Sequence, residues 1–78
     1  MNKEFEYQLG QRIRTFRERR GLTQEQLAAQ LQTRGCDVTR SALAKMEVGL
    51  RHIYPDELRQ LKSLLGVSYG ELLDTPQQ

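Results

Sequence analysis

The sequence has a single cysteine, no long apolar run and no alternating strand pattern. One Cys among 78 residues excludes an internal disulfide and fits a reducing compartment. No apolar stretch approaches the ~20 residues that a membrane span needs, and the charged start MNKEFEYQL lacks the apolar segment of a signal peptide. With 37% apolar and 28% charged residues, the chain reads as one soluble cytoplasmic domain.

Residue patterns of catalytic and metal sites are also missing. The chain shows no Ser/His/Asp set, no paired acids of a pocket and no glycine-rich phosphate loop, and a chain this short buries only about 60% of its unfolded surface. Cys36 and His52 each stand alone, without metal-ligand spacing. We therefore expect no enzyme, no metal, no cofactor and no small-molecule substrate. Cys36 is interpreted as a small loop residue, with a redox-sensing thiol beside Arg34 as the less favoured alternative.

The charge is unevenly distributed along the chain. Residues 1–54 carry ten Lys and Arg against six Asp and Glu, whereas residues 55–78 carry two against four. A positive front half is a weak indication of a polyanionic partner, and an ordinary solvated surface explains it equally simply.

Apolar spacing and capping signals predict the first two helices. Four apolar residues recur at helical spacing before Gly21, which suits a helix end: Phe5, Leu9, Ile13 and Phe16. Thr23 is then placed as the N-cap of a second helix, and Gln26 three residues later completes a capping box.

The same kinds of capping and helix-end residues predict three further helices. Thr39 caps a third helix of only about nine residues, which Gly49 ends. Pro55 suits the first position of a fourth helix ending at Gly66, and Ser68 opens a short fifth helix with a second capping box.

The sequence therefore predicts a compact all-α, five-helix domain spanning residues 1–78, with a folded part at 5–73 and a frayed tail at 74–78. Its predicted core consists of Phe5, Leu9, Ile13, Phe16, Leu27, Leu31, Leu43, Met46, Leu58, Leu61 and Leu65.

The third helix has few apolar residues and a distinctive outer face. At 100° per residue, Leu43 and Met46 point to the core, and the opposite side carries small and hydrogen-bonding residues with two cations: Arg40, Ser41, Ala44, Lys45 and Val48. Small residues allow close approach, and Arg, Lys and Ser donate to base edges in a major groove that admits one α-helix. A short solvated surface helix shows similar residues, so the pattern alone leaves both interpretations open.

Three blocks in order carry a family resemblance over residues 9–73: LGQRIRTFRERRGLTQEQLAAQL, VTRSALAKMEVG and DELRQLKSLLGVSYGELL. They resemble the helix-turn-helix domain of lambda-type phage repressors and Cro, the Xre-like family. The resemblance implies a lambda-repressor-like domain that regulates transcription, as a repressor of phage, prophage or bacterial origin. It further implies a nucleoid-associated homodimer on a pseudo-palindromic double-stranded DNA operator, with recognition helix 39–48 in the major groove.

The resemblance also implies roles for individual residues. Base-reading positions correspond to Arg40, Ser41, Ala44 and Lys45, and phosphate-contacting positions to Gln24, Thr39, Arg51 and His52. Arg17 and Glu47 correspond to a structural salt bridge between helices, and an unpaired carboxylate at the border of the buried side would lose solvation. Dimer contacts are assigned on other grounds, because apolar residues that follow the core helices add area that a small domain leaves uncovered: Tyr69, Leu72 and Leu73. The same residues equally well close the core of the monomer.

One segment departs from the family pattern. A turn of the family type would place the third helix cap three residues after Leu31, but Thr39 comes eight after it, an insertion of five residues. Residues 33–37 suit no regular element, and Arg34 among them is either a phosphate contact or, as we favour, solvated. The longer turn leaves the crossing angle of the third helix open.

Two other functions fit the same architecture. One is a protein-interaction module, antitoxin-like or antagonist-like, that uses Tyr54, Tyr69 and Leu73 in place of the third helix. The other is a controller protein of a restriction-modification system, which the sequence does not separate from a prophage repressor.

Overall fold

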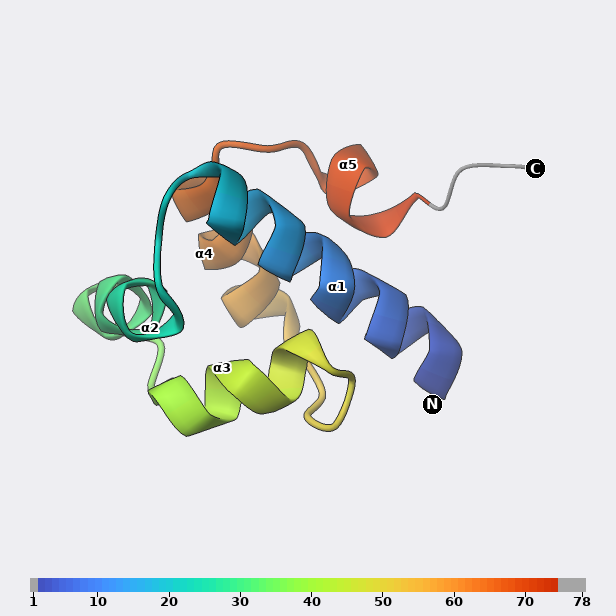
Figure 1. Cartoon of the computed structure of the whole chain (residues 1–78), viewed down its shortest axis with the longest axis horizontal. Helices are drawn as coiled ribbons and strands as arrows, with labels where there is room; N and C mark the ends of the chain where they lie inside the picture. Colours follow the sequence, from blue (N-terminus) through green and yellow to red (C-terminus); the bar gives the residue numbers. More distant parts are fainter. Residues whose placement is uncertain (1, 75–78) are drawn as a thin grey trace.

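The computed structural model describes residues 2–74 as five helices: α1 (Lys3–Arg19), α2 (Gln24–Thr33), α3 (Arg40–Glu47), α4 (Pro55–Leu65) and α5 (Tyr69–Leu73). No strand occurs in this part of the chain, so the predicted all-α fold with five helices is confirmed. Figure 1 shows α1 running diagonally over the molecule, with α3 crossing beneath it and α4 behind it. Within these residues no helix is long and apolar enough to span a membrane. Of the predicted frayed tail, residues 75–78 lie outside the described part.

Local hydrogen bonds fix the helix starts where the sequence predicted them. Thr23 Oγ1 accepts from the Gln26 N–H at 3.0 Å, and Gln26 Oε1 accepts from the Thr23 N–H at 2.9 Å, which completes a capping box. Ser68 and Glu71 exchange the same two bonds at the start of α5. These caps satisfy backbone donors that have no partner inside their own helix.

Most of the predicted core is confirmed, and three members need correction. Eight residues are buried: Leu9, Ile13, Leu27, Leu31, Leu43, Met46, Leu61 and Leu65. Phe5 is 39% exposed, because it lies in the first turn of α1 and lines an open hollow there. Phe16 and Leu58 are only partly buried against the core. The core also takes in residues not predicted for it: Ala28, Cys36, Val38, Ile53 and Leu72.

The long connection between α2 and α3 is folded onto the core. Thr33 is the last residue of α2, which corrects the expectation that residues 33–37 are all irregular. The Cys36 N–H donates to the Leu31 carbonyl at 2.9 Å, so the chain turns back under the helix end. Val38 is fully buried at the far side of the turn. The connection thus contributes two apolar side chains to the core, Cys36 from the added residues and Val38 next to them.

Two polar side chains fasten this connection to its surroundings. Gln32 Nε2 donates to the Val38 carbonyl at 2.9 Å. Arg34 Nη1 donates to Ser63 Oγ on α4 at 2.7 Å. Arg34 is exposed, as favoured from the sequence, and it also holds the connection to α4 through this hydrogen bond.

Candidate nucleic-acid interface

Helix α3 is held to the core by a small set of contacts with α1 and α2. Leu43 and Met46 are both fully buried, as the sequence predicted. Gly10 of α1 lies directly against the end of α3, since a Cβ at this position would lie 2.2 Å from the Met46 carbonyl oxygen. The two helix backbones thus approach to a distance that no other residue at position 10 permits.

A buried ion pair fixes the orientation of α3 around Glu47. Arg17 Nε donates to Glu47 Oε2 at 2.7 Å, and Arg17 Nη2 donates to Glu47 Oε1 at 3.1 Å. The side chains are 9% and 2% exposed, so the predicted pair exists and is almost dry. Arg17 Nη1 also donates to the Leu22 carbonyl at 2.7 Å. With every charge hydrogen-bonded, the pair joins α1, the start of α2 and α3 in one geometry.

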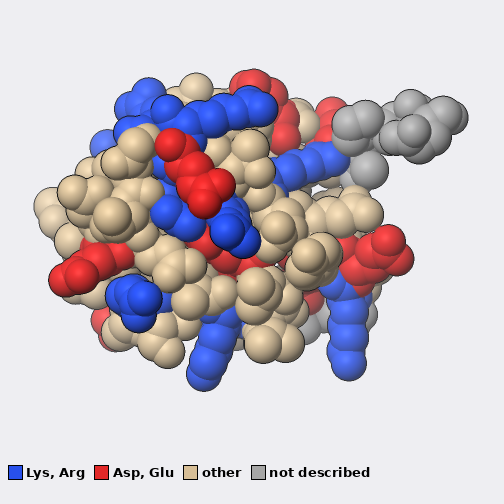
Figure 2. All heavy atoms as spheres, in the orientation of Figure 1, with Lys and Arg blue, Asp and Glu red and all other residues tan. Residues whose placement is uncertain are grey.

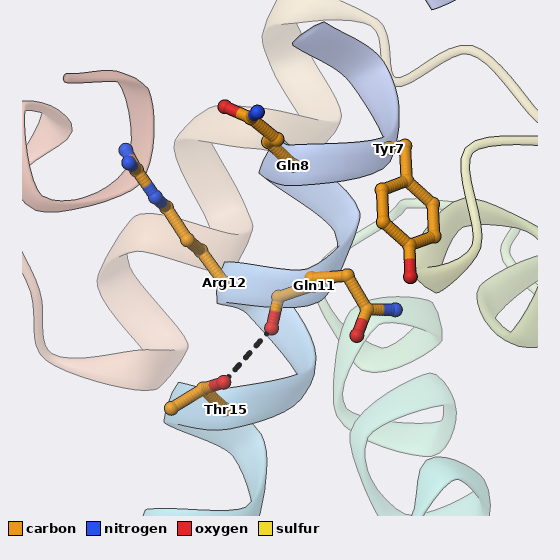
Figure 3. A pocket seen from close by; sticks show the side chains of 5 residues that line it. All are labelled: Tyr7, Gln8, Gln11, Arg12 and Thr15. Carbon is orange, nitrogen blue, oxygen red and sulfur yellow. Dashed lines mark hydrogen bonds between the residues drawn. The ribbon is translucent and has the colours of Figure 1, made fainter. Parts of the chain in front are cut away.

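Two glutamines complete this network. Gln24, the first residue of α2, donates from Nε2 to Glu47 Oε1 at 3.0 Å. Gln11 Nε2 donates to the Glu47 backbone carbonyl at 2.7 Å. Figure 3 shows Gln11 and Tyr7 pointing to one side of α1 and Arg12 to the other, in a shallow hollow on this helix. The Glu47 carbonyl lies in the last turn of α3, where the helix itself supplies no N–H donor, so Gln11 provides the missing partner.

The outer face of α3 carries the residues assigned to base reading. Arg40, Ser41 and Lys45 are exposed and Ala44 is half-buried. Within residues 2–74, neither Arg40 nor Lys45 forms an ion pair. Figure 2 shows a basic side chain projecting beyond the lower edge of the molecule where α3 lies in Figure 1. The face therefore offers two cations and a hydroxyl around a small residue.

The N-terminal end of α2 lies beside this face. An open hollow of about 450 Å³ separates them, lined among others by Thr23, Gln24, Ala44 and Val48. The first backbone N–H groups of α2 and the positive end of its dipole border the hollow, which suits an anion. Thr39 caps α3, and its Oγ1 accepts from the Ala42 N–H at 3.0 Å. The N-terminus of α2 therefore borders a hollow that offers backbone donors to a phosphate.

The two residues expected to contact phosphate after α3 have partners inside the fold. Arg51 donates to both carboxylate oxygens of Glu57, at 2.8 and 2.9 Å. His52 Nδ1 lies 2.7 Å from Glu6 Oε1 on α1. In the structure both side chains brace the connection between α3 and α4, and their role as phosphate contacts stays a prediction.

The Arg51 and Glu57 pair shifts the pKa of both groups. The hydrogen bond to Glu57 raises the pKa of the Arg51 guanidinium further above its already high value. Burial alone would raise the pKa of Glu57, but the hydrogen bonds from Arg51 and from the Tyr54 N–H outweigh burial and lower it. The charge of Arg51 is therefore offset locally by a carboxylate that stays ionised at neutral pH.

The predicted dimer residues on α5 do not share one environment. Tyr69 is 42% exposed, and the ammonium of Lys62 lies 5.0 Å from its ring centroid. Leu72 is only 1% exposed and belongs to the core of the monomer, so its assignment as a dimer contact is corrected. Leu73 is partly buried and lines the hollow that Phe5 also lines. In the part of the chain that the structure describes, no three His, Cys, Asp or Glu side chains are grouped to hold a metal.

Sequence reasoning missed Gly10 and Gln11, which hold the end of α3. A signal for Gly10 was present, because glycine inside a helical pattern is unfavourable unless packing requires it. Gln11 carries no such signal, since a glutamine on an exposed helix face is ordinary.

Comparison with known proteins finds a matching family model and a similar solved structure. A family model described as a helix-turn-helix domain matches residues 8–75. The crystal structure of the DNA-binding domain of BldD is similar, with a TM-score of 0.78 and 29% sequence identity over 94% of this chain and 99% of that one. No curated protein matches the sequence significantly.

Proposed function

The chain belongs to the helix-turn-helix domain family, and we propose that it is a sequence-specific, double-stranded DNA-binding regulator of transcription. The architecture with its Arg17 and Glu47 pair favours the lambda-repressor-like, Xre-like branch of such domains. The similar structure is titled as a DNA-binding domain, which supports the same partner for this chain.

The observation that carries the proposal is the division of α3 into two faces. One face is fixed by Leu43, Met46 and the buried Glu47, and the other offers Arg40, Ser41 and Lys45 to solvent. A helix held so rigidly positions its side chains to within the tolerance that hydrogen bonds to base edges need. A solvated surface helix does not require an almost fully buried ion pair to fix its orientation.

The proposed mechanism has α2 across the DNA backbone and α3 in the major groove. The open N–H groups of α2 at Gln24 and the capped start of α3 at Thr39 approach phosphates. Arg40 and Lys45 donate to guanine O6 and N7 or to nearby phosphates, Ser41 serves several base acceptors, and Ala44 makes room for close approach. Arg17 and Glu47 position α3 and do not touch DNA.

We further propose that the protein acts as a cytoplasmic, nucleoid-associated repressor and binds as a homodimer. One such module reads few base pairs, so two copies on a pseudo-palindrome are needed for a tight and selective complex. The centres of the half-sites are expected about one helical turn apart.

Selection of bound sequences from a random duplex pool, followed by titration at several salt concentrations, tests the DNA proposal. We expect a recurrent pseudo-palindrome and an affinity that falls with salt at a log-log slope of about −0.9 for each phosphate neutralised. Recovery of no recurrent sequence, or an affinity independent of salt, would contradict the proposal.

Single substitutions then separate base reading from backbone contact. Arg40→Ala and Lys45→Ala should each cost about 1–3 kcal/mol on the selected sequence and much less on random duplex. Arg59→Ala removes an exposed cation of α4 and serves as the matched control. Equal losses on both duplexes would reassign the residue to the DNA backbone.

A further inference from the structure

Helices α1 to α4 all end in the same backbone motif. A glycine follows each helix in the left-handed conformation, with φ of 71°, 85°, 75° and 68° at Gly21, Gly35, Gly49 and Gly66. The N–H of the next residue donates to a carbonyl five positions back in the helix, over 3.1, 2.9, 2.8 and 3.2 Å in chain order. In this motif the residue after the glycine commonly packs an apolar side chain against the helix end.

One of the four motifs breaks the packing rule. The residues after the glycines are all apolar: Leu22, Cys36, Leu50 and Val67. Cys36 is buried, and Leu22 and Val67 are partly buried against the core. Leu50 is 77% exposed, the most exposed large apolar side chain of the described residues. Leu50 is therefore exposed to solvent, whereas the equivalent apolar residue at each of the other three helix ends is packed against the core.

An apolar hollow lies on the same side of the molecule as Leu50. Leu50 borders a depression lined also by Lys3, Glu6 and His52. Glu6 and His52, 2.7 Å apart, also border a second hollow of about 250 Å³. The apolar lining of that second hollow consists of Phe5, Leu9, Ile53, Leu58 and Leu73. The hydrogen-bonded Glu6 and His52 thus form a ridge between an apolar knob and an apolar recess.

We propose that two copies of the chain meet on this face, with Leu50 of each copy seated in the apolar hollow of the other. This inference rests on the proposed binding to paired half-sites. A two-fold interface brings the same patch of both copies together, so it requires a knob and a matching recess side by side on one surface. Lys3 and Glu6 at the rim carry opposite charges, and Glu6 is also hydrogen-bonded to His52, so the rim holds no excess of one sign.

The proposed interface leaves the DNA-binding face open. Arg40, Ser41 and Lys45 line neither hollow, so both α3 helices remain available. One leucine and its recess make a small contact, and interfaces of this kind are weak in solution. Two half-sites on one duplex raise the effective concentration of the second copy, so the contact acts mainly on DNA.

Leu50→Ser tests the interface against DNA carrying one or two selected half-sites. The substitution is neutral in charge and lies at an exposed position, so the thermal midpoint should be unchanged. We expect affinity for one half-site to stay within about twofold, and affinity for the paired site to fall about tenfold or more as avidity is lost. Equal losses on both duplexes would make Leu50 a DNA contact, and no loss on the paired site would also overturn the proposal. Tyr69→Ser provides the comparison, because it alters the exposed α5 surface and should leave the paired site unaffected.

A crosslinking experiment tests the same contact without relying on DNA. Leu50→Cys and Phe5→Cys are prepared separately in a Cys36→Ala background, and both must show cooperative unfolding. A mixture of the two, oxidised at high protein concentration with and without the paired site, should form a disulfide-linked dimer that neither variant forms alone to the same extent. Absence of the mixed dimer under both conditions would overturn the interface. If no DNA sequence is selected but the mixed dimer forms, the DNA proposal fails and the interface stands.

Discussion

Arg17 and Glu47 join α1 to α3 by two hydrogen bonds, of 2.7 and 3.1 Å, in an almost dry environment. Removing one partner leaves the other charged, buried and unpaired, which costs far more than losing a surface pair. Glu47→Ala should lower the free energy of unfolding by about 3–5 kcal/mol, measured by urea denaturation. Glu18→Ala removes the exposed partner of Arg14 at 3.4 Å and should cost at most about 1 kcal/mol.

Removing both charges tests whether the stability lost in Glu47→Ala comes from the buried charge that is left unpaired. Arg17→Met combined with Glu47→Leu removes both charges and keeps apolar volume, so it should recover a large part of the stability lost by Glu47→Ala. A double variant less stable than Glu47→Ala would contradict this account. Because α3 loses its orientation in the double variant, its DNA affinity should remain low even when its stability recovers.

Gly10 is expected to be irreplaceable although it lies inside a helix. Alanine is a better helix former by about 1 kcal/mol, but its Cβ would lie 2.2 Å from the Met46 carbonyl oxygen, a backbone atom that cannot move independently. Gly10→Ala should therefore lower the free energy of unfolding by about 1–3 kcal/mol, since α1 and α3 must separate. Gly70→Ala is the matched control, because its Cβ would meet side-chain oxygens and no backbone atom, Asp74 Oδ2 at 3.3 Å and Ser68 Oγ at 3.7 Å. A Gly10→Ala variant as stable as the parent would refute the close approach.

The Arg51 and Glu57 pair predicts a stability that depends on pH in the acid range. The folded-state pKa of Glu57 is lowered, so the unfolded chain binds its proton first as pH falls. The stability from this pair is complete above the unfolded pKa of about 4.3 and is lost as pH drops below it towards the folded value. Unfolding free energies of the parent and Glu57→Gln, measured from pH 7 to pH 2, should converge below about pH 4. Arg51→Met should show the same flattened profile, and a parent profile that does not converge would contradict the pair.

The starts and ends of the helices were predictable from sequence because capping involves residues that are close together in the chain. The side-chain oxygens of Thr23, Thr39 and Ser68 each accept from the N–H three residues later. Both partners of each hydrogen bond can therefore be identified in a short stretch of sequence. The same holds for the glycine helix ends. The two-faced pattern of α3 also followed from helical periodicity, whereas the roles of its outer residues remain a prediction.

Partners far apart in the chain were not predictable. Glu6 and His52 are 46 positions apart, and their contact depends on how the N-terminus of α1 lies over the connection after α3. Leu72 and Tyr69 occupy one five-residue helix, but only the packing of α5 on α1 decides which of them is buried. The turn before α3 looked irregular because its order comes from Gln32, Arg34 and two buried side chains and not from a repeating pattern.

Cys36 should be a structural side chain with low reactivity. Burial raises the pKa of its thiol first, and the nearby negative charges of Asp56 and Glu57 raise it further. Since the thiolate is the reacting species, modification by a disulfide reagent at pH 8 should be more than about tenfold slower in the folded protein than in urea. Peroxide at concentrations that oxidise sensor thiols should leave DNA binding unchanged. Fast modification of the folded protein, or a loss of DNA binding in peroxide, would restore the redox-sensing interpretation. If Cys36→Ala then abolished the peroxide response, that response would be assigned to Cys36.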